Sequence, residues 1–263
     1  MDLSLKNKTA IVTGGTQGIG FSISEKLLSY GCNVALCSRN LKNISNAEKK
    51  LKKKFKNFYI EKVDVVIDED INFFYKNILK KFSKVDILIN NVGGGGNIGK
   101  NSFDSTSYKL WNSTIEANLG SAIKFTKLCL PNMKKNKWGR VISISSISTN
   151  KYTGRPWYNV AKNSQNALIN SLSAKKTYVK NGITFNTISP GSIMTKNSNL
   201  FKLKKNNRKK FNEILKNNFP MEEIGDPEDI SNLVLYLCSQ YSRYINGANI
   251  FVDGGESKLN FKF

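Results

Sequence analysis

The sequence predicts an α/β fold, a single doubly wound parallel sheet of about seven strands with helices on both faces. Short apolar runs of strand length recur along the chain, and stretches with helical periodicity lie between them. This alternation is typical of parallel sheets, whose right-handed crossovers place helices on both faces. No repeat, low-complexity linker or break in composition divides the chain, so residues 1–263 are predicted to form a single domain.

The predicted strands are the apolar runs, and the predicted helices follow from the spacing of apolar residues between them. One helix has Leu41, Ile44, Glu48, Leu51 and Phe55 on one face, and its remaining positions are largely lysine. Further helices are expected at about 104–132 and 156–180. The predicted strands are 9–13, 33–37, 58–63, 85–90, 140–145, 183–189 and 248–252.

The composition excludes several classes of protein. With 263 residues, of which 40% are hydrophobic, the chain can bury a full core, so disorder is excluded as its main state. The chain has no His, which excludes His-based triads and the two-His zinc protease motif. A catalyst of this composition has to use Tyr, Lys, Cys or carboxylates.

The cysteines and the hydropathy indicate where the protein resides. The four cysteines, Cys32, Cys37, Cys129 and Cys238, form no CxxC pair. We therefore expect free thiols in a reducing compartment, with no disulfide and no metal site. No apolar stretch approaches the roughly 20 residues that a membrane-spanning helix needs. The sequence thus predicts a soluble, cytoplasmic protein without a membrane partner.

A glycine-rich turn follows the first predicted strand and opens a helix. Gly14, Gly18 and Gly20 lie in the run TGGTQGIG, which also contains Thr16, Gln17 and Ile19. Glycines let backbone N–H groups approach a pyrophosphate closely, and a helix N-terminus favours an anion. A tight structural turn without a ligand is the alternative interpretation.

The spacing TGxxxGxG resembles that of the short-chain dehydrogenase/reductase (SDR) family, and similar motifs follow in the family's order. Asn90-Asn91-Val92-Gly93 resembles its NNAG motif, and Val252-Asp253-Gly254-Gly255 resembles its C-terminal strand ending. The matches run from residue 9 to 255. Within the family, the sequence resembles members that are similar to 3-oxoacyl-[acyl-carrier-protein] reductases. The resemblance implies a Rossmann fold and a cofactor site made of Gly14, Thr16, Gln17, Gly18, Ile19, Gly20, Ser38, Arg39, Asp64, Val65, Asn91, Val92, Gly93, Tyr158, Lys162, Pro190, Gly191, Ile193 and Thr195.

The end of the second predicted strand favours NADP(H) over NAD(H). It reads Cys37-Ser38-Arg39, without the acidic residue that would hold the ribose 2′-hydroxyl of NAD. An Arg accommodates a 2′-phosphate through charge-assisted hydrogen bonds. In the alternative interpretation, Arg39 is a solvated residue before the next helix.

Tyr158 and Lys162 are the candidate proton-transfer pair. They are four residues apart, which on a helix places both side chains on one face. A phenol with a pKa near 10 is a poor base at neutral pH, so a cation that favours the phenolate would activate it. Chance alone gives about 1.4 matches to YxxxK in a chain of this composition, so the position of the motif carries the argument.

The remaining catalytic candidates are a serine and an asparagine. The run GRVISISSIS offers Ser145 and Ser146, and alternation along a strand places them on opposite faces. Alignment with the start of the family's motif selects Ser146, whereas the usual interval to Tyr158 selects Ser145. Polar termination of a buried strand is the alternative for this run. Asn118 matches the family's active-site asparagine, and the alternative is an amide bonded to helix backbone.

The resemblance implies hydride transfer between the nicotinamide and a carbonyl carbon. In the implied reaction, Tyr158 passes the proton and Ser146 fixes the substrate oxygen. Lys162 lowers the pKa of Tyr158 and holds the nicotinamide ribose. Asn118 holds a water that relays protons to Lys162. The implied substrate is a small carbonyl compound or secondary alcohol, either a 3-oxoacyl thioester or, as the alternative, a sugar, sugar acid or polyol.

The net charge is +22, from 41 Lys and Arg against 19 Asp and Glu, and two segments hold much of the excess. Residues 42–62 are interpreted as a solvated helix face. Residues 196–216 carry seven Lys and one Arg against Glu213, within a substrate lid expected at about 192–220. Such a lid would attract an anionic substrate, although a general bias of composition toward lysine explains the charge equally well.

Two further classes of function are less consistent with the sequence. A nucleic-acid-binding protein would use the basic surface, but the basic segments lack the interleaved aromatics of a stacking platform, so no nucleic-acid partner is expected. A cofactor sensor without catalysis is disfavoured by the intact Asn118, Ser146, Tyr158 and Lys162. The resemblance also implies a homo-oligomer, a tetramer or a dimer, with its interface on helices 104–132 and 156–180.

Overall fold

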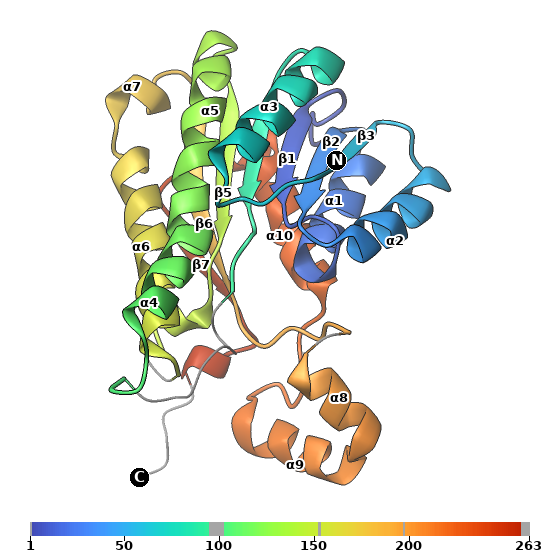
Figure 1. Cartoon of the computed structure of the whole chain (residues 1–263), viewed down its shortest axis with the longest axis vertical. Helices are drawn as coiled ribbons and strands as arrows, with labels where there is room; N and C mark the ends of the chain where they lie inside the picture. The colour runs from blue at the N-terminus through green and yellow to red at the C-terminus, as the bar shows by residue number, and fades with distance from the viewer. Residues whose placement is uncertain (1, 95–102, 152–153, 197, 259–263) are drawn as a thin grey trace.

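The structure is a computed structural model, and it describes residues 2–94, 103–151, 154–196 and 198–258. Within these ranges seven parallel strands form one sheet with the order β3-β2-β1-β4-β5-β6-β7 (Figure 1). The predicted Rossmann-type sheet is confirmed. The strands are β1 (Thr9–Thr13), β2 (Asn33–Ser38), β3 (Phe58–Lys62), β4 (Ile87–Asn90), β5 (Gly139–Ile144), β6 (Ile183–Pro190) and β7 (Asn249–Val252).

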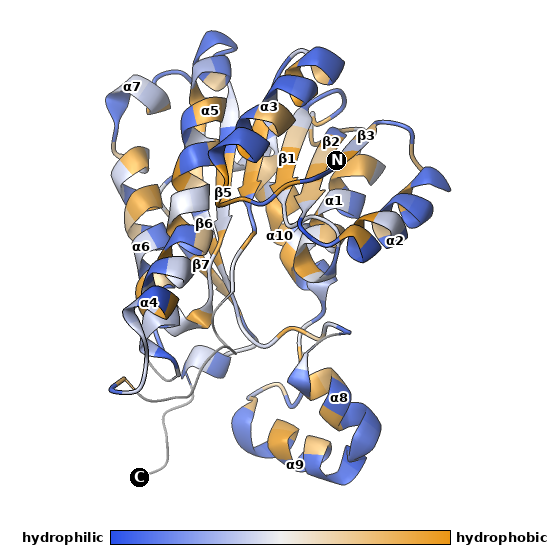
Figure 2. Cartoon of the chain, viewed as in Figure 1, coloured by the Kyte–Doolittle hydropathy of each residue, from blue (hydrophilic) through white to orange (hydrophobic). Residues whose placement is uncertain are grey.

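Helices cover both faces of the sheet, and each face has its own apolar core. Because side chains alternate along a strand, Val12 of β1 joins one core and Ile11 joins the other. The first core contains the inner faces of α1 (Gly18–Ser29), α2 (Leu41–Lys52) and α10 (Pro227–Cys238). The second contains those of α3 (Asp68–Phe82), α5 (Ser121–Lys135) and α6 (Pro156–Ser173). In Figure 2 the strands and inner helix faces are hydrophobic and the outer faces hydrophilic.

Three predicted helices differ from those observed. α2 ends at Lys52, so Phe55 lies beyond it, and Leu41 at its start is 63% exposed. The helix expected at 104–132 begins as α4 (Tyr108–Ile115), passes through a π-helical turn, η1 (Glu116–Gly120), and continues as α5. The helix expected at 156–180 is divided into α6 and α7 (Lys176–Val179). Single π-helical turns inside α-helices are frequent at functional sites.

The basic segment forms a helical hairpin. α8 (Asn199–Asn206) and α9 (Arg208–Asn218) pack against each other and project away from the sheet (Figure 1). Phe211 of α9 is buried in this hairpin, whereas the lysines lie on its outer surface. The segment from 192 to 220 therefore leaves the body of the protein at the end of β6.

The strand order indicates where a ligand binds. The connections run one way from β1 through β2 to β3 and the other way from β4 onward, so the order reverses between β1 and β4. In open α/β sheets the crevice at the carboxyl ends of the strands on either side of such a reversal is the usual ligand site. Both predicted motifs, TGGTQGIG and NNVG, begin at this point.

Candidate active site

The carboxyl ends of β1 and β4 are joined through the hydroxyl of Thr13. It accepts hydrogen bonds from the backbone N–H groups of Asn91 and Val92, each at 3.0 Å. The amide of Asn91 in turn donates to the backbone oxygens of Thr13 at 2.9 Å and Gly14 at 3.3 Å. The NNVG motif is thereby fixed against the glycine turn.

The glycine turn fits an anionic group such as a diphosphate. Gly14 and Gly18 have φ angles of +64° and +53°, which L side chains rarely adopt. A Cβ on Gly20 would collide with the Asn91 amide and the Gly14 carbonyl. Gln17, at the N-cap of α1, provides no side-chain cap, and the hydroxyl of Thr16 is buried without a partner among the described residues. The first N–H groups of α1, among which is that of Ile19, thus face the turn that contains Thr16.

The predicted 2′-phosphate residues lie at the ends of β2 and β3. The Arg39 guanidinium is 74% exposed and lies 3.8 Å from the carboxylate of Asp64. The hydroxyl of Ser38 accepts a hydrogen bond from the backbone N–H of Asn40 at 3.2 Å. Val65, beside Asp64, is buried. The structure therefore brings Ser38, Arg39, Asp64 and Val65 to one edge of the crevice, with no carboxylate on β2 itself.

Tyr158 and Ser146 meet in a cavity of about 260 Å³ at the end of β5. Tyr158 lies in the first turn of α6, where its hydroxyl is hydrogen-bonded to that of Ser146. Burial raises the pKa of Tyr158, and the bond to Ser146 opposes this rise. Beside these two residues, the cavity is lined by Ile147, Ser148, Lys151, Gly154, Arg155, Asn159 and Glu256.

Ser145 and Ser146 have different surroundings. The Ser145 hydroxyl donates to the backbone oxygen of Lys162 at 3.3 Å, which anchors α6 to the end of β5. The Ser146 hydroxyl instead reaches Tyr158 and accepts from the backbone N–H of Ser148 at 3.2 Å. Of the two serines, Ser146 is therefore the one in the cavity with Tyr158.

Lys162 is a buried cation that no carboxylate balances among the described residues. Its Nζ atom donates to the backbone oxygen of Ile144 at 2.9 Å and to the side-chain oxygen of Gln165 at 3.0 Å. It lies 5.9 Å from the centre of the Tyr158 ring. Burial lowers the pKa of Lys162 to about 7. The Nζ atom of Lys162 is thus directed to the Ile144 oxygen and the Gln165 side chain.

Asn118 lies in the π-helical turn between α4 and α5 and is fully buried. Its side-chain N–H groups donate to the backbone oxygens of Thr114 at 2.8 Å and Gly94 at 3.0 Å. Its side-chain oxygen has no partner among the described residues. A Cβ on Gly93 would lie 2.8 Å from this oxygen and 2.7 Å from Nζ of Lys162. Both polar atoms therefore lie so close to Gly93 that any side chain at this position would displace one of them.

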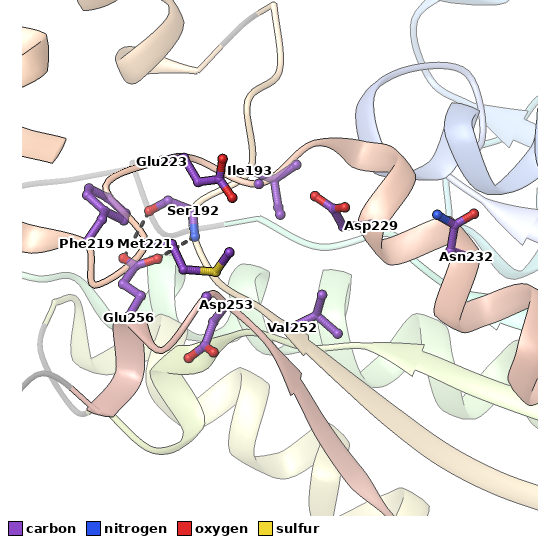
Figure 3. A pocket seen from close by; sticks show the side chains of 12 residues that line it. Ser192, Ile193, Phe219, Met221, Glu223, Asp229, Asn232, Val252, Asp253 and Glu256 are labelled. Atoms are coloured by element: carbon purple, nitrogen blue, oxygen red, sulfur yellow. Dashed lines mark hydrogen bonds between the residues drawn. The ribbon is translucent and has the colours of Figure 1, made fainter.

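The segment after β6 is held over the crevice from two sides. Thr195 approaches Gly18, since a Cβ on Gly18 would lie 3.4 Å from its methyl group. On the other side, the Glu256 carboxylate accepts hydrogen bonds from the Ser192 N–H at 2.6 Å and hydroxyl at 3.0 Å (Figure 3). Glu256 and Asp253 also lie against Gly191. Pro190, Gly191, Ile193 and Thr195 thus lie in one strap that spans the ends of β1 and β7.

A second cavity of about 360 Å³ lies behind this strap, and it does not include Tyr158 (Figure 3). Ile193, Phe219 and Met221 supply apolar walls. Glu256 lines both cavities. Ser146 and Tyr158 line the smaller cavity, which is therefore the candidate active site, whereas Lys162 and Asn118 are not among its lining residues.

Trp157, the residue before Tyr158, packs in the interior. It is fully buried, and its ring lies 6.3 Å from that of Trp111 in an edge-on arrangement. Tyr152 lies outside the described residues, as do residues 95–102 and residue 197 of the predicted lid.

Sequence reasoning missed three residues of this region, namely Thr13, Gln165 and Glu256. Gln165 is three residues beyond Lys162, a spacing at which helical side chains are neighbours, so the pair was detectable in principle. The roles of Thr13 and Glu256 depend on partners 78 and 64 residues away, for which the sequence carries no local signal.

Comparison with known proteins agrees with this geometry. A family model described as enoyl-(acyl carrier protein) reductase matches residues 14–257. The 3-oxoacyl-[acyl-carrier-protein] reductase FabG of Buchnera aphidicola subsp. Schizaphis graminum is 34% identical over 257 residues, 96% of this chain and 98% of the relative. Human dehydrogenase/reductase SDR family member 4 is 29% identical over 252 residues, 95% of this chain and 88% of the relative. The chain belongs to the SDR family.

Solved structures lead to the same family. L-sorbose reductase from Gluconobacter frateurii, in complex with NADPH and L-sorbose, matches with a TM-score of 0.89 and 27% identity over 99% of this chain and all of the other. This SDR protein is an oxidoreductase that acts on CH–OH and C=O groups and uses a nicotinamide cofactor. In the described part of the chain, no helix has the length and apolar character needed to cross a membrane.

Proposed function

We propose that this SDR protein is an NADP(H)-dependent enzyme that interconverts a carbonyl and a secondary alcohol, with Tyr158 as the proton donor and acceptor. The observation that carries the proposal is the Tyr158 hydroxyl, buried in a cavity and bonded to Ser146, with Lys162 behind it. A positioned proton-transfer group of this kind contributes about 10²–10⁴-fold to a rate.

The dinucleotide, when bound, supplies the hydride in reduction and accepts it in oxidation. The positive-φ glycines, the open N-terminus of α1 and the unpartnered Thr16 hydroxyl would hold its diphosphate. Asp64 and Val65 would contact its adenine, and the strap from Pro190 to Thr195 would cover its nicotinamide. Arg39 supports a preference for NADP(H), because its guanidinium is exposed at the end of a strand that carries no carboxylate.

The side chains of the smaller cavity would handle the substrate oxygen and its proton. Ser146 would donate a hydrogen bond to the substrate oxygen and orient it toward Tyr158. In reduction Tyr158 gives its hydroxyl proton to that oxygen, and in oxidation it takes the proton back. Lys162 would stabilise the phenolate that is left, and Asn118 would hold a water that connects Lys162 to solvent.

Two substrate classes are supported by different observations. A 3-oxoacyl thioester is supported by the FabG relatives and by the basic hairpin of α8 and α9, which would attract an anionic carrier. A sugar, sugar acid or polyol is supported by the similarity to L-sorbose reductase and by the polar side chains that line the smaller cavity. Reduction is the direction that NADP(H) favours.

The experiment that tests this proposal is a parallel titration of the protein with NADPH and NADH, followed by fluorescence, and then a screen of carbonyl substrates from both classes. We expect NADPH to bind more tightly than NADH and to be oxidised by at least one carbonyl compound. Equal affinity for the two cofactors would overturn the NADP(H) preference. Tight cofactor binding without turnover of any class would favour a cofactor sensor.

We further propose that the protein is a cytoplasmic homo-oligomer, a tetramer or a dimer. Tyr108 of α4 and Val160 of α6 are 78% and 46% exposed, which supports an interface on these helices. The four cysteines are buried free thiols, which fits a reducing compartment. Sedimentation analysis measures the mass directly, and a monomer at micromolar concentration would contradict the oligomer.

A further inference from the structure

A fully buried glutamine connects two of the candidate catalytic residues. Gln165 lies on α6 and is 0% exposed. Its side-chain oxygen accepts a hydrogen bond from Nζ of Lys162 at 3.0 Å, and its side-chain nitrogen donates to the backbone oxygen of Asn118 at 3.0 Å. The carboxamide therefore joins the lysine of one helix to the π-helical turn between α4 and α5.

The two partners determine the orientation of this amide. An ammonium group can only donate, and a backbone carbonyl can only accept, so the Gln165 oxygen must face Lys162 and its nitrogen must face Asn118. In a flipped amide, the Gln165 nitrogen would face the Lys162 ammonium, donor against donor. The Gln165 oxygen would face the Asn118 backbone oxygen, acceptor against acceptor. Because the group is buried, leaving either end unpaired would be costly, and both ends are held in place.

Lys162 depends on this amide because its other acceptor is also an uncharged dipole, the backbone oxygen of Ile144. Among the described residues, the neighbouring elements present no charged group to it. On α6 the titratable side chain that faces it is Tyr158. The turn η1 presents Asn118, and the ends of β4 and β5 present Gly93 and Ser145. Glu116 of η1 is paired with Lys124 instead.

We propose that Gln165 is a positioning residue of the active site, whose carboxamide fixes the direction of the Lys162 ammonium and maintains its positive charge by tying it to the Asn118 turn. Without this bond, Lys162 would lose one of its two acceptors and the fixed link to Asn118. The consequence for catalysis rests on the proposed function, whereas the effect on the charge of Lys162 does not.

Two substitutions of Gln165 shift the titration of Lys162 in opposite directions. Gln165→Met removes the acceptor at similar volume, so the charged form of Lys162 loses a hydrogen bond and its titration midpoint falls below about 7. Gln165→Glu replaces the amide by a carboxylate, which favours the ammonium and raises the midpoint. We expect shifts of about one pH unit in each direction. A residue with a purely structural role would not reverse the sign.

The experiment is an NMR titration of the full-length, cofactor-free protein labelled with ¹³C at the lysine Cε. The signal of Lys162 is assigned by its loss in Lys162→Met. The matched control is Asn186→Leu, because Asn186 is also buried and its amide bridges the Ile245 oxygen and the Ala248 N–H instead of Lys162 and Asn118. This control is expected to lower thermal stability without moving the midpoint.

Midpoints that stay within about 0.3 pH units of the wild-type value in both Gln165 variants would overturn the proposal, as would shifts of the same sign. If one of the two Gln165 variants does not fold, the direction in which the Lys162 midpoint shifts in the other variant still tests the proposal. The second readout is the pH profile of NADPH-dependent carbonyl reduction, in which the limb assigned to Lys162 should move with the NMR midpoint. If the wild type neither binds NADPH nor reduces a carbonyl, the proposed function fails, while the NMR midpoints still decide the role of Gln165.

Discussion

The hydroxyl of Thr13 accepts a hydrogen bond from the backbone N–H of Asn91 at 3.0 Å, which connects the end of β1 to the end of β4. The two strands flank the point where the strand order reverses. The Thr13 side chain thus fixes the position of the glycine turn relative to the NNVG motif, on the two sides of the crevice.

Thr13→Val should weaken cofactor binding. The substitution keeps the shape of the side chain but leaves the N–H groups of Asn91 and Val92 without their acceptor, at a cost of about 1–3 kcal/mol in stability. We expect the Kd for NADPH to rise about tenfold, measured by fluorescence titration. Thr184→Val, on β6 and far from this end of the sheet, is the control. An unchanged Kd in Thr13→Val would show that the link is dispensable.

Gly93→Ala should abolish most of the activity. The added methyl group would lie 2.7 Å from Nζ of Lys162 and 2.8 Å from the side-chain oxygen of Asn118, so one of the two has to move. We expect kcat to fall about 100-fold, the scale of a misplaced catalytic group. Gly94→Ala is a matched control, since no atom of the described residues lies within 4 Å of its added Cβ. Equal activity of the two variants would contradict the crowded geometry around Gly93.

The stability of the fold should depend on pH through Lys162. Burial lowers the pKa of Lys162 from its ordinary value of 10.5 to about 7, so between these values the unfolded chain binds one proton more than the folded chain. The free energy of unfolding therefore rises with pH in this window. Relative to Lys162→Met, which lacks this group, the wild type should gain stability from pH 7 to pH 10 in urea unfolding. Parallel curves for the two proteins would mean that the burial of Lys162 does not shift its pKa.

The basic hairpin should matter for an anionic substrate and not for a neutral one. Reversal of three charges with Lys204→Glu, Lys205→Glu and Lys209→Glu should raise the KM for an acyl thioester several-fold at low salt, with the effect shrinking at high salt. The control reverses Lys49, Lys50 and Lys53 in and after α2, within the other lysine-rich segment of the chain. If both triple variants raise the KM to the same extent, the effect comes from the general positive charge of the surface and not from the hairpin.

Arg39→Ala should separate the two cofactors. Loss of a charge-assisted hydrogen bond to a 2′-phosphate should weaken NADPH binding about 10- to 100-fold and leave NADH binding unchanged. The same fluorescence titration measures both. A parallel loss for NADH would mean that Arg39 acts on the fold or on Asp64, with which it pairs at 3.8 Å, and not on the phosphate.

Much of the fold was predictable because local patterns determine it. Each predicted strand matches an observed one within two residues, since buried parallel strands are short apolar runs. The start of β4 was misplaced because Val85 bonds its N–H to the Asn132 side chain, outside the sheet. The π-helical turn at Asn118 was not foreseen, because the apolar spacing on which the helix prediction rested carries no signal for it; in the structure this turn packs against α6.

The candidate site was only partly predictable. Motif order placed Asn118, Ser146, Tyr158 and Lys162, and the structure brings them to one end of the sheet. Between Ser145 and Ser146, only the three-dimensional contacts with Lys162 and Tyr158 distinguish the two hydroxyls. The link from Gln165 to Asn118 spans 47 residues, so it became visible only in the folded chain.

The most direct test of the central claim is the turnover of Tyr158→Phe with NADPH and a carbonyl compound that the wild type reduces. The substitution removes the hydroxyl that is bonded to Ser146 and leaves the ring in place. We predict that kcat falls about 10²–10⁴-fold while the Kd for NADPH stays within about twofold of the wild-type value. A variant that binds NADPH normally and retains wild-type kcat would contradict the assignment of Tyr158 as the proton-transfer residue.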